Sequence, residues 1–167
     1  MSKTLTLDKH GYQLIQKELV EKTFEDEYRI KKLYYPEVAE LIKRVTEATK
    51  IYVGQHVIRR RSWDAAFEEE KNLRDDARST GPSDARFVHY DLALDGARAR
   101  IAKLRPENAD KLYKCRWATV NLWKPFDYPV RRDALCLADS SSTRNDALRP
   151  IKIRFPARRD SVREEAA

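Results

Sequence analysis

A histidine and an aspartate one residue apart carry the clearest potential for chemistry in this sequence. His89 and Asp91 lie in the segment Arg86-Phe87-Val88-His89-Tyr90-Asp91. Successive side chains of a strand alternate between its faces, so both would project from one face with their donor atoms close together. A facial non-haem iron site uses two imidazoles and one carboxylate and leaves positions open. The pair matches part of such a site, but a hydrogen-bonded surface pair explains the same spacing.

The elements that must position this pair can be read from the pattern of apolar residues. Residues 35–49 predict a helix, because Pro36 suits a first turn and Val38, Leu41, Ile42 and Val45 recur on one face. Shorter helices are expected around residues 65–77, from Asp95 to Leu104, and after Pro106 up to residue 114. Alternating or β-branched runs predict strands. They cover residues 51–58, 86–94, 116–123, 134–138 and 151–155.

Strands spread along the chain, with helices mostly in the first half, favour an α+β fold that is mainly antiparallel β. We expect a single domain over residues 1–156. The last residues, 157–167, are charged and are predicted to form a poorly ordered tail.

The charge of the chain gives little indication of a partner. There are 34 Lys and Arg against 27 Asp and Glu, a net charge of +7, but the two signs are interleaved. Arg59, Arg60 and Arg61 form one short basic run, which either recognises an anionic group or ends a solvated strand. No nucleic-acid-binding motif or concentrated basic face accompanies it, so nucleic acid is not an expected partner.

The cysteines and the apolar runs indicate where the protein resides. Cys115 and Cys136 lie in apolar, strand-like runs without metal-ligand spacing, so we expect buried, reduced thiols. No apolar run approaches the roughly 18 residues that span a bilayer, and no signal-peptide core follows Met1. The expectation is a cytoplasmic protein with no membrane partner.

Seven motifs occur in register along the chain. They include Val88-His89-Tyr90-Asp91 and Val120-Asn121-Leu122-Trp123-Lys124-Pro125, and the remaining five cover residues 6–12, 34–38, 55–61, 134–139 and 151–156. In this order they resemble the fungal and bacterial hydroxylase/desaturase family, which includes gibberellin desaturase-like enzymes, asperfuranone-pathway-type hydroxylases and the cephamycin 7-alpha-methoxylase small chain. The resemblance covers residues 6–155.

The resemblance implies a double-stranded β-helix of the jelly-roll or cupin type that binds Fe(II) and the co-substrate 2-oxoglutarate. By this match His89 and Asp91 are the metal ligands and catalytic residues. Such enzymes use dioxygen to oxidise 2-oxoglutarate to succinate and carbon dioxide and to remove hydrogen from a substrate carbon, and the metal and co-substrate supply the reactive chemistry.

The sequence departs from the family in its third metal ligand. The chain has three histidines, and neither His10 nor His56 follows the His-x-Asp pair, whereas the family has a distant downstream histidine. His56 could substitute as a ligand or could have a structural place in its motif, and His10 is expected at the surface. The basic residue that would bind the far carboxylate of 2-oxoglutarate is also absent. We therefore expect a chain shortened at both ends, with an incomplete β-helix.

Asn121, Trp123 and Lys124 are the candidate co-substrate residues. Inward-facing Asn121 and Trp123 would line the pocket, and Lys124 stands where the family usually has arginine. A lysine neutralises a carboxylate without the planar two-pronged contact of arginine. In the alternative interpretation Trp123 belongs to the core and Lys124 faces solvent.

The sequence thus predicts an oxidoreductase of the Fe(II)/2-oxoglutarate type that hydroxylates or desaturates a small secondary metabolite, in truncated or impaired form. The alternative is a catalytically inactive remnant that acts as a binding or regulatory module. Self-association through unpaired strand edges is also expected.

Overall fold

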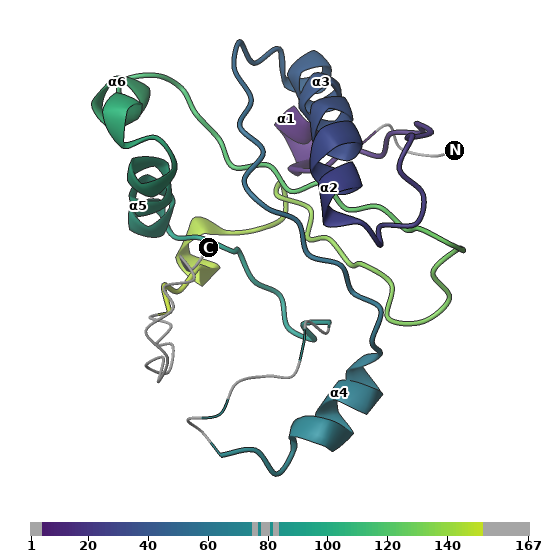
Figure 1. Ribbon diagram of the computed structural model, residues 1–167. Helices are drawn as coiled ribbons and strands as arrows, with labels where there is room; N and C mark the ends of the chain where they lie inside the picture. Colours follow the sequence, from purple (N-terminus) through teal and green to yellow (C-terminus); the bar gives the residue numbers. More distant parts are fainter. Residues whose placement is uncertain (1–4, 75–76, 78–80, 82–83, 152–167) are drawn as a thin grey trace. The chain divides into compact units, whose positions relative to one another are not determined.

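The computed structural model describes residues 5–74, 77, 81 and 84–151, and helices are the regular elements of these residues (Figure 1). The chain divides into two compact units. One contains Met1–Glu18, Gln55–Phe87 and Val130–Ala167, and the other contains Leu19–Gly54 and Val88–Pro129. His89, Asp91, Asn121, Trp123 and Lys124 all belong to the second unit.

One run of helical backbone dominates the second unit (Figure 1). It begins with the short helix α2 (Glu27–Arg29), passes through the π-helix η1 (Ile30–Tyr34) and continues as α3 (Tyr35–Thr46). Asp26 caps its start, since one carboxylate oxygen accepts from the backbone N–H groups of the second and third helical residues at 2.8 and 3.3 Å. The run ends where Glu47 takes a left-handed conformation, with φ of 57°.

The core of this unit lies along one face of that run. Ile30, Tyr34, Val38 and Leu41 are buried and follow each other at the three-and-four spacing of a helix face. Phe24, from the preceding turn, packs its ring edge-on against the Tyr34 ring at 4.9 Å. The helix predicted at residues 35–49 is therefore confirmed, although it ends at Thr46.

A helical hairpin forms the other part of the second unit. It consists of α5 (Leu94–Leu104), the 3-10 turn η2 (Pro106–Asn108) and α6 (Ala109–Tyr113). The Tyr113 hydroxyl donates to the Arg98 carbonyl at 2.8 Å, and the small buried side chains of Ala97 and Ala109 permit close packing. Asp95 lies in the first turn of α5, but Ala93 occupies the N-cap position, so the predicted Asp95 cap is wrong.

The first unit contains α1 (Leu7–His10), α4 (Trp63–Glu70) and the 3-10 turn η3 (Asn145–Ala147). Helix α1 stops at Gly11, whose φ of 79° suits glycine. Ser140 holds this turn, because its backbone N–H donates to the His10 carbonyl at 3.0 Å. Helix α4 confirms the helical stretch expected near Ala65, and the Ser62 side chain caps it.

The predicted α+β, mainly antiparallel β fold is wrong for the described part of the chain, which contains no strand and so no double-stranded β-helix. The segments at residues 51–58, 86–94, 116–123 and 134–138 form no ladder there, and Leu94 begins helix α5. Alternation and β-branched residues favour extended backbone, but a strand also needs a partner segment to complete its hydrogen bonds.

The remaining expectations concern the C-terminal residues, the number of domains, the membrane and self-association. Residues 152–155 of the last predicted strand and the tail at 157–167 lie outside the described residues, and the single domain over 1–156 stays a prediction. None of the helices in the described ranges has both the length and the apolar character required to cross a membrane. Self-association also stays a prediction, with exposed apolar side chains such as Leu14 and Val88 as candidate contacts.

Candidate functional site

The His89 and Asp91 side chains lie together on an irregular segment before α5. Nε2 of His89 is 3.4 Å from Oδ1 of Asp91, and both side chains are about half exposed. The two side chains therefore contact each other as the sequence predicted, although the segment that carries them is not a strand. The contact alone also agrees with the simpler interpretation of a surface His–Asp pair.

Asn121 completes a cluster of three polar side chains. Its amide Nδ2 donates to Oδ2 of Asp91 at 2.5 Å, from a segment 30 residues further along the chain. The two carboxylate oxygens of Asp91 therefore have different neighbours, with His89 at Oδ1 and Asn121 at Oδ2. The sequence placed Asn121 near a co-substrate, but its direct contact with Asp91 was not predicted.

The geometry of the pair can be compared with what an iron ion requires. With metal–ligand bonds of about 2.1 Å, two adjacent octahedral ligands have donor atoms about 3.0 Å apart. The observed 3.4 Å separation needs only a small adjustment, so one imidazole and one carboxylate fit two positions of such a site. No group of three or more His, Cys, Asp or Glu able to hold a metal occurs among the residues that the structure covers.

The other two histidines belong to the first unit, whereas His89 belongs to the second. His10 is only 8% exposed, and its Nδ1 accepts from the backbone N–H of Thr6 at 3.1 Å. The expectation of a surface His10 is therefore wrong, because the short helix α1 folds its imidazole back over its own N-terminus. His56 is half-buried, and its role as a ligand or a structural residue stays a prediction.

Lys124 lies at a cavity in the second unit. The cavity has a volume of about 550 Å³. Its lining is Lys22, Thr23, Lys124, Pro125, Phe126, Asp127, Tyr128 and Pro129. The Lys124 ammonium group also lies over the Phe24 ring, 5.1 Å from the ring centroid.

The cavity lining carries two ammonium groups, Lys22 and Lys124, and one carboxylate, Asp127. Partial burial lowers the pKa of the Lys124 ammonium group, and the nearby Lys22 ammonium lowers it further, against weaker opposing effects of Asp127, Glu21 and Glu37. Two ammonium groups beside an apolar wall repel each other. An anion placed between them would relieve this repulsion.

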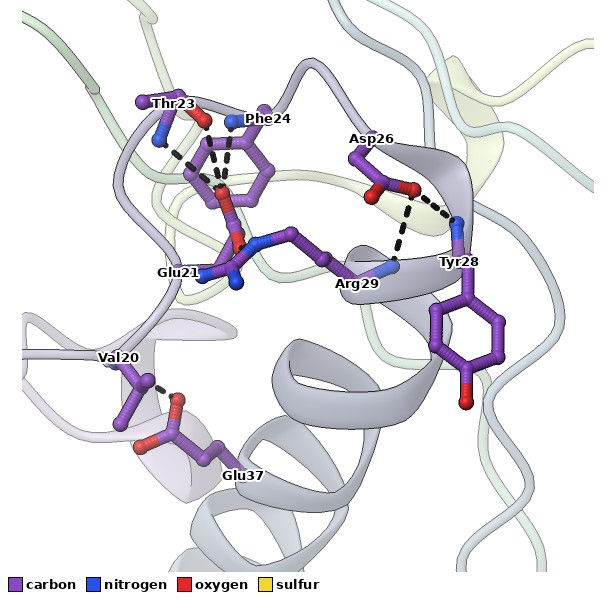
Figure 2. Close-up of polar contacts among 8 residues, drawn as sticks. All are labelled: Val20, Glu21, Thr23, Phe24, Asp26, Tyr28, Arg29 and Glu37. Atoms are coloured by element: carbon purple, nitrogen blue, oxygen red, sulfur yellow. Dashed lines mark hydrogen bonds and ion pairs between the residues drawn. The ribbon is translucent and has the colours of Figure 1, made fainter.

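Glu21, which the sequence analysis did not single out, bonds to Thr23, one of the residues that line the cavity; Figure 2 shows the contacts of its carboxylate. Its carboxylate is 1% exposed. Oε1 accepts at 3.1 Å from the Thr23 backbone, the Thr23 hydroxyl and the Phe24 backbone, and Oε2 pairs with Arg29 Nε at 3.2 Å. These bonds, the Phe24 contact first, hold the pKa of Glu21 below its usual value despite burial.

The remaining residues that the sequence singled out are a tryptophan, an arginine and the two cysteines, and none of them lines the cavity. Trp123 is 48% exposed, so it is not the core residue of the alternative interpretation. Arg61 pairs with Glu69 at 3.1 Å and with Glu70 at 2.7 Å on α4, which neutralises much of its charge. Cys115 and Cys136 are free thiols as predicted, but they are exposed instead of buried, and the strand-like runs in which they lie form no strands in the described residues.

The second unit thus combines a His–Asp pair that suits two positions of a metal site with a basic cavity. A family model described as "Oxidoreductase/YMDC permease-like domain" matches residues 1–166, and the chain belongs to this family.

Curated relatives confirm the resemblance to hydroxylase/desaturase proteins. The chain is 38% identical over 144 residues to a hydroxylase/desaturase from Cercospora beticola, covering 85% of this chain and 44% of that protein. It is 32% identical over 152 residues to a hydroxylase/desaturase from Hormonema carpetanum, covering 90% and 51%. An alpha-ketoglutarate-dependent dioxygenase from Talaromyces stipitatus is 34% identical over 146 residues, with 86% and 50% covered. The chain spans about half the length of these relatives.

Proposed function

We propose that the chain functions as an oxidoreductase that uses Fe(II) and 2-oxoglutarate to hydroxylate or desaturate a small secondary metabolite. The observation that carries this proposal is the contact of His89 with Asp91, 3.4 Å apart, in a chain that belongs to an oxidoreductase family. The names of the relatives, hydroxylase/desaturase and alpha-ketoglutarate-dependent dioxygenase, support the same reaction class.

In this proposal, the His89 imidazole and one Asp91 oxygen hold the metal on one side. Iron with 2-oxoglutarate and dioxygen would supply the oxidising chemistry that removes hydrogen from a substrate carbon. The imidazole would offer its Nε2 lone pair and the carboxylate one oxygen. The protein side chains therefore contribute binding and orientation.

The cavity is the proposed place for a carboxylate of 2-oxoglutarate. Lys124 would neutralise that carboxylate, and Lys22 and the Thr23 hydroxyl lie in the same lining. The neighbouring Lys22 ammonium group, which lowers the pKa of Lys124, adds a second positive charge to the same lining. Asn121 and Trp123 lie on the same segment but outside the cavity lining, so their contact with the co-substrate stays a prediction.

Anaerobic absorption spectroscopy tests the proposal. Fe(II) and 2-oxoglutarate added to the purified chain should produce a metal-to-ligand charge-transfer band, and oxygen should then produce succinate. His89→Ala and Asp91→Asn should abolish the band. Asp110→Asn is the matched control, since Asp110 is an exposed carboxylate on the same unit that lies outside the cluster. His56→Ala tests the candidate third ligand in the same assay.

The absence of both the band and succinate in the wild-type chain would refute the enzyme function. The alternative, a binding or regulatory module without turnover, would then be the function to pursue, and family membership would stand unchanged. A band that persists in His89→Ala and Asp91→Asn would instead place the metal elsewhere.

A further inference from the structure

We infer that Asn121 is a positioning residue for the metal-binding carboxylate of Asp91. This inference rests on the proposed function, which assigns the metal to His89 and Asp91. It gives Asn121 a task different from contact with the co-substrate. The observation behind it is the hydrogen bond from Asn121 Nδ2 to Asp91 Oδ2 at 2.5 Å.

The bond orients the Asp91 carboxylate so that one of its two oxygens faces the histidine. Asp91 Oδ2 accepts from Asn121, and Oδ1 lies 3.4 Å from His89 Nε2. The bond from Asn121 restrains rotation of the carboxylate about its last bond, because intermediate orientations would lose the contact. One oxygen is therefore occupied by Asn121, and the other, beside His89, is left for a metal.

The choice of an amide at this position has an electrostatic advantage. A lysine or arginine could also hold the carboxylate, but its positive charge would repel the metal cation next to it. The Asn121 amide is neutral, so it orients Asp91 without this penalty. Partners of this kind determine how metal ligands point, and their removal typically costs about 10–100-fold in metal affinity.

Asn121 also connects the pair to the cavity. It precedes Lys124 by three residues, and three residues of extended chain span at most about 11 Å. The segment that binds Asp91 is thus the segment that brings Lys124 to the cavity lining. Loss of the Asn121 contact should therefore make the positions of both the Asp91 carboxylate and the Lys124 side chain less well defined.

Cobalt(II) titration of the purified chain tests the inference, with the visible absorption of bound cobalt as the signal. Asn121→Leu has nearly the same volume but no amide, and it should bind Co(II) about 10–100-fold more weakly, with an altered band shape. Asn121→Gln, which retains the amide, should recover part of the affinity. Asn108→Leu is the control, because Asn108 donates a comparable bond to the Glu107 carboxylate at 2.9 Å.

The outcomes separate the inference from the function on which it rests. If wild type binds no Co(II), the proposed metal site fails and this inference fails with it. If wild type binds but Asn121→Leu has the same affinity and band shape, only the role of Asn121 is overturned. An equal loss in Asn108→Leu would also overturn it. NMR of the metal-free chain should show the Asn121 side-chain amide resonances shifting in Asp91→Ala, and unchanged resonances would contradict the contact itself.

Discussion

Phe24 contacts both the buried face of the helical run and two residues of the cavity lining, Phe126 and Lys124, so its replacement should destabilise the second unit. The ring is 7% exposed. It packs against Tyr34 at 4.9 Å and Phe126 at 5.1 Å, and Lys124 lies over it. We predict that Phe24→Ala lowers the free energy of unfolding by about 3–5 kcal/mol, the usual cost of removing a buried aromatic ring.

Two further substitutions divide this cost into its physical parts. Phe24→Leu keeps most of the apolar volume and loses the two ring pairs, which at about 0.5–1.5 kcal/mol each amount to about 1–3 kcal/mol. Phe24 has a φ of 53°, a left-handed conformation that costs a residue with a side chain about 1–2 kcal/mol. Phe24→Gly should therefore be no less stable than Phe24→Ala, although glycine loses about 0.5–1 kcal/mol through its freedom in the unfolded chain.

Urea unfolding followed by circular dichroism measures these free energies, provided that the variants share one dependence on urea. Leu14→Ala is the control. Its side chain is 89% exposed, so its effect should stay within about 0.5 kcal/mol. A Phe24→Ala variant as stable as Leu14→Ala would refute the packing argument. A Phe24→Gly variant clearly less stable than Phe24→Ala would refute the argument from backbone conformation.

Three other predictions address Glu21, Asp26 and Lys124. The pKa of Glu21 is lowered in the folded chain from an ordinary 4.5, so its stabilisation is present above that pH and is lost as the pH falls through the folded pKa. Urea midpoints of Glu21→Gln should therefore depend less on pH in this acid range than those of wild type. Asp26→Ala should cost about 0.5–2 kcal/mol in urea unfolding by removing the N-cap of α2, whereas Asp26→Asn should retain most of the stability. Lys124→Met should weaken 2-oxoglutarate binding about tenfold to a hundredfold in calorimetry with Mn(II), against no change for the exposed control Lys31→Met.

The helices were largely predictable because their signals are local. Pro36 and the spacing of Val38 and Leu41 define α3 without reference to the rest of the chain. The buried position of His10 was missed, since it depends on a single turn of helix that carries no apolar period. Extended segments failed as strand predictions because pairing depends on a partner that alternation does not reveal.

The candidate site was predictable in its residue types and not in its contacts. His89 and Asp91 are neighbours in sequence, so their meeting follows from the chain itself. The bond from Asn121 to Asp91 and the packing of Phe24 against Phe126 join segments far apart in the sequence, and composition gives no indication of such pairings. Glu21 was missed because a lone glutamate among polar residues carries no pattern, although it bonds to a residue of the cavity lining.

The two exposed thiols allow the distance between the two units to be measured with labels. Cys136 belongs to the first unit and Cys115 to the second, and both are free and accessible to reagents. Maleimide or nitroxide labels at this native pair would report the distance between the units by energy transfer or electron paramagnetic resonance, with no residue engineered. Titration of the labelled chain with Fe(II) and 2-oxoglutarate would then measure whether ligand binding changes this distance.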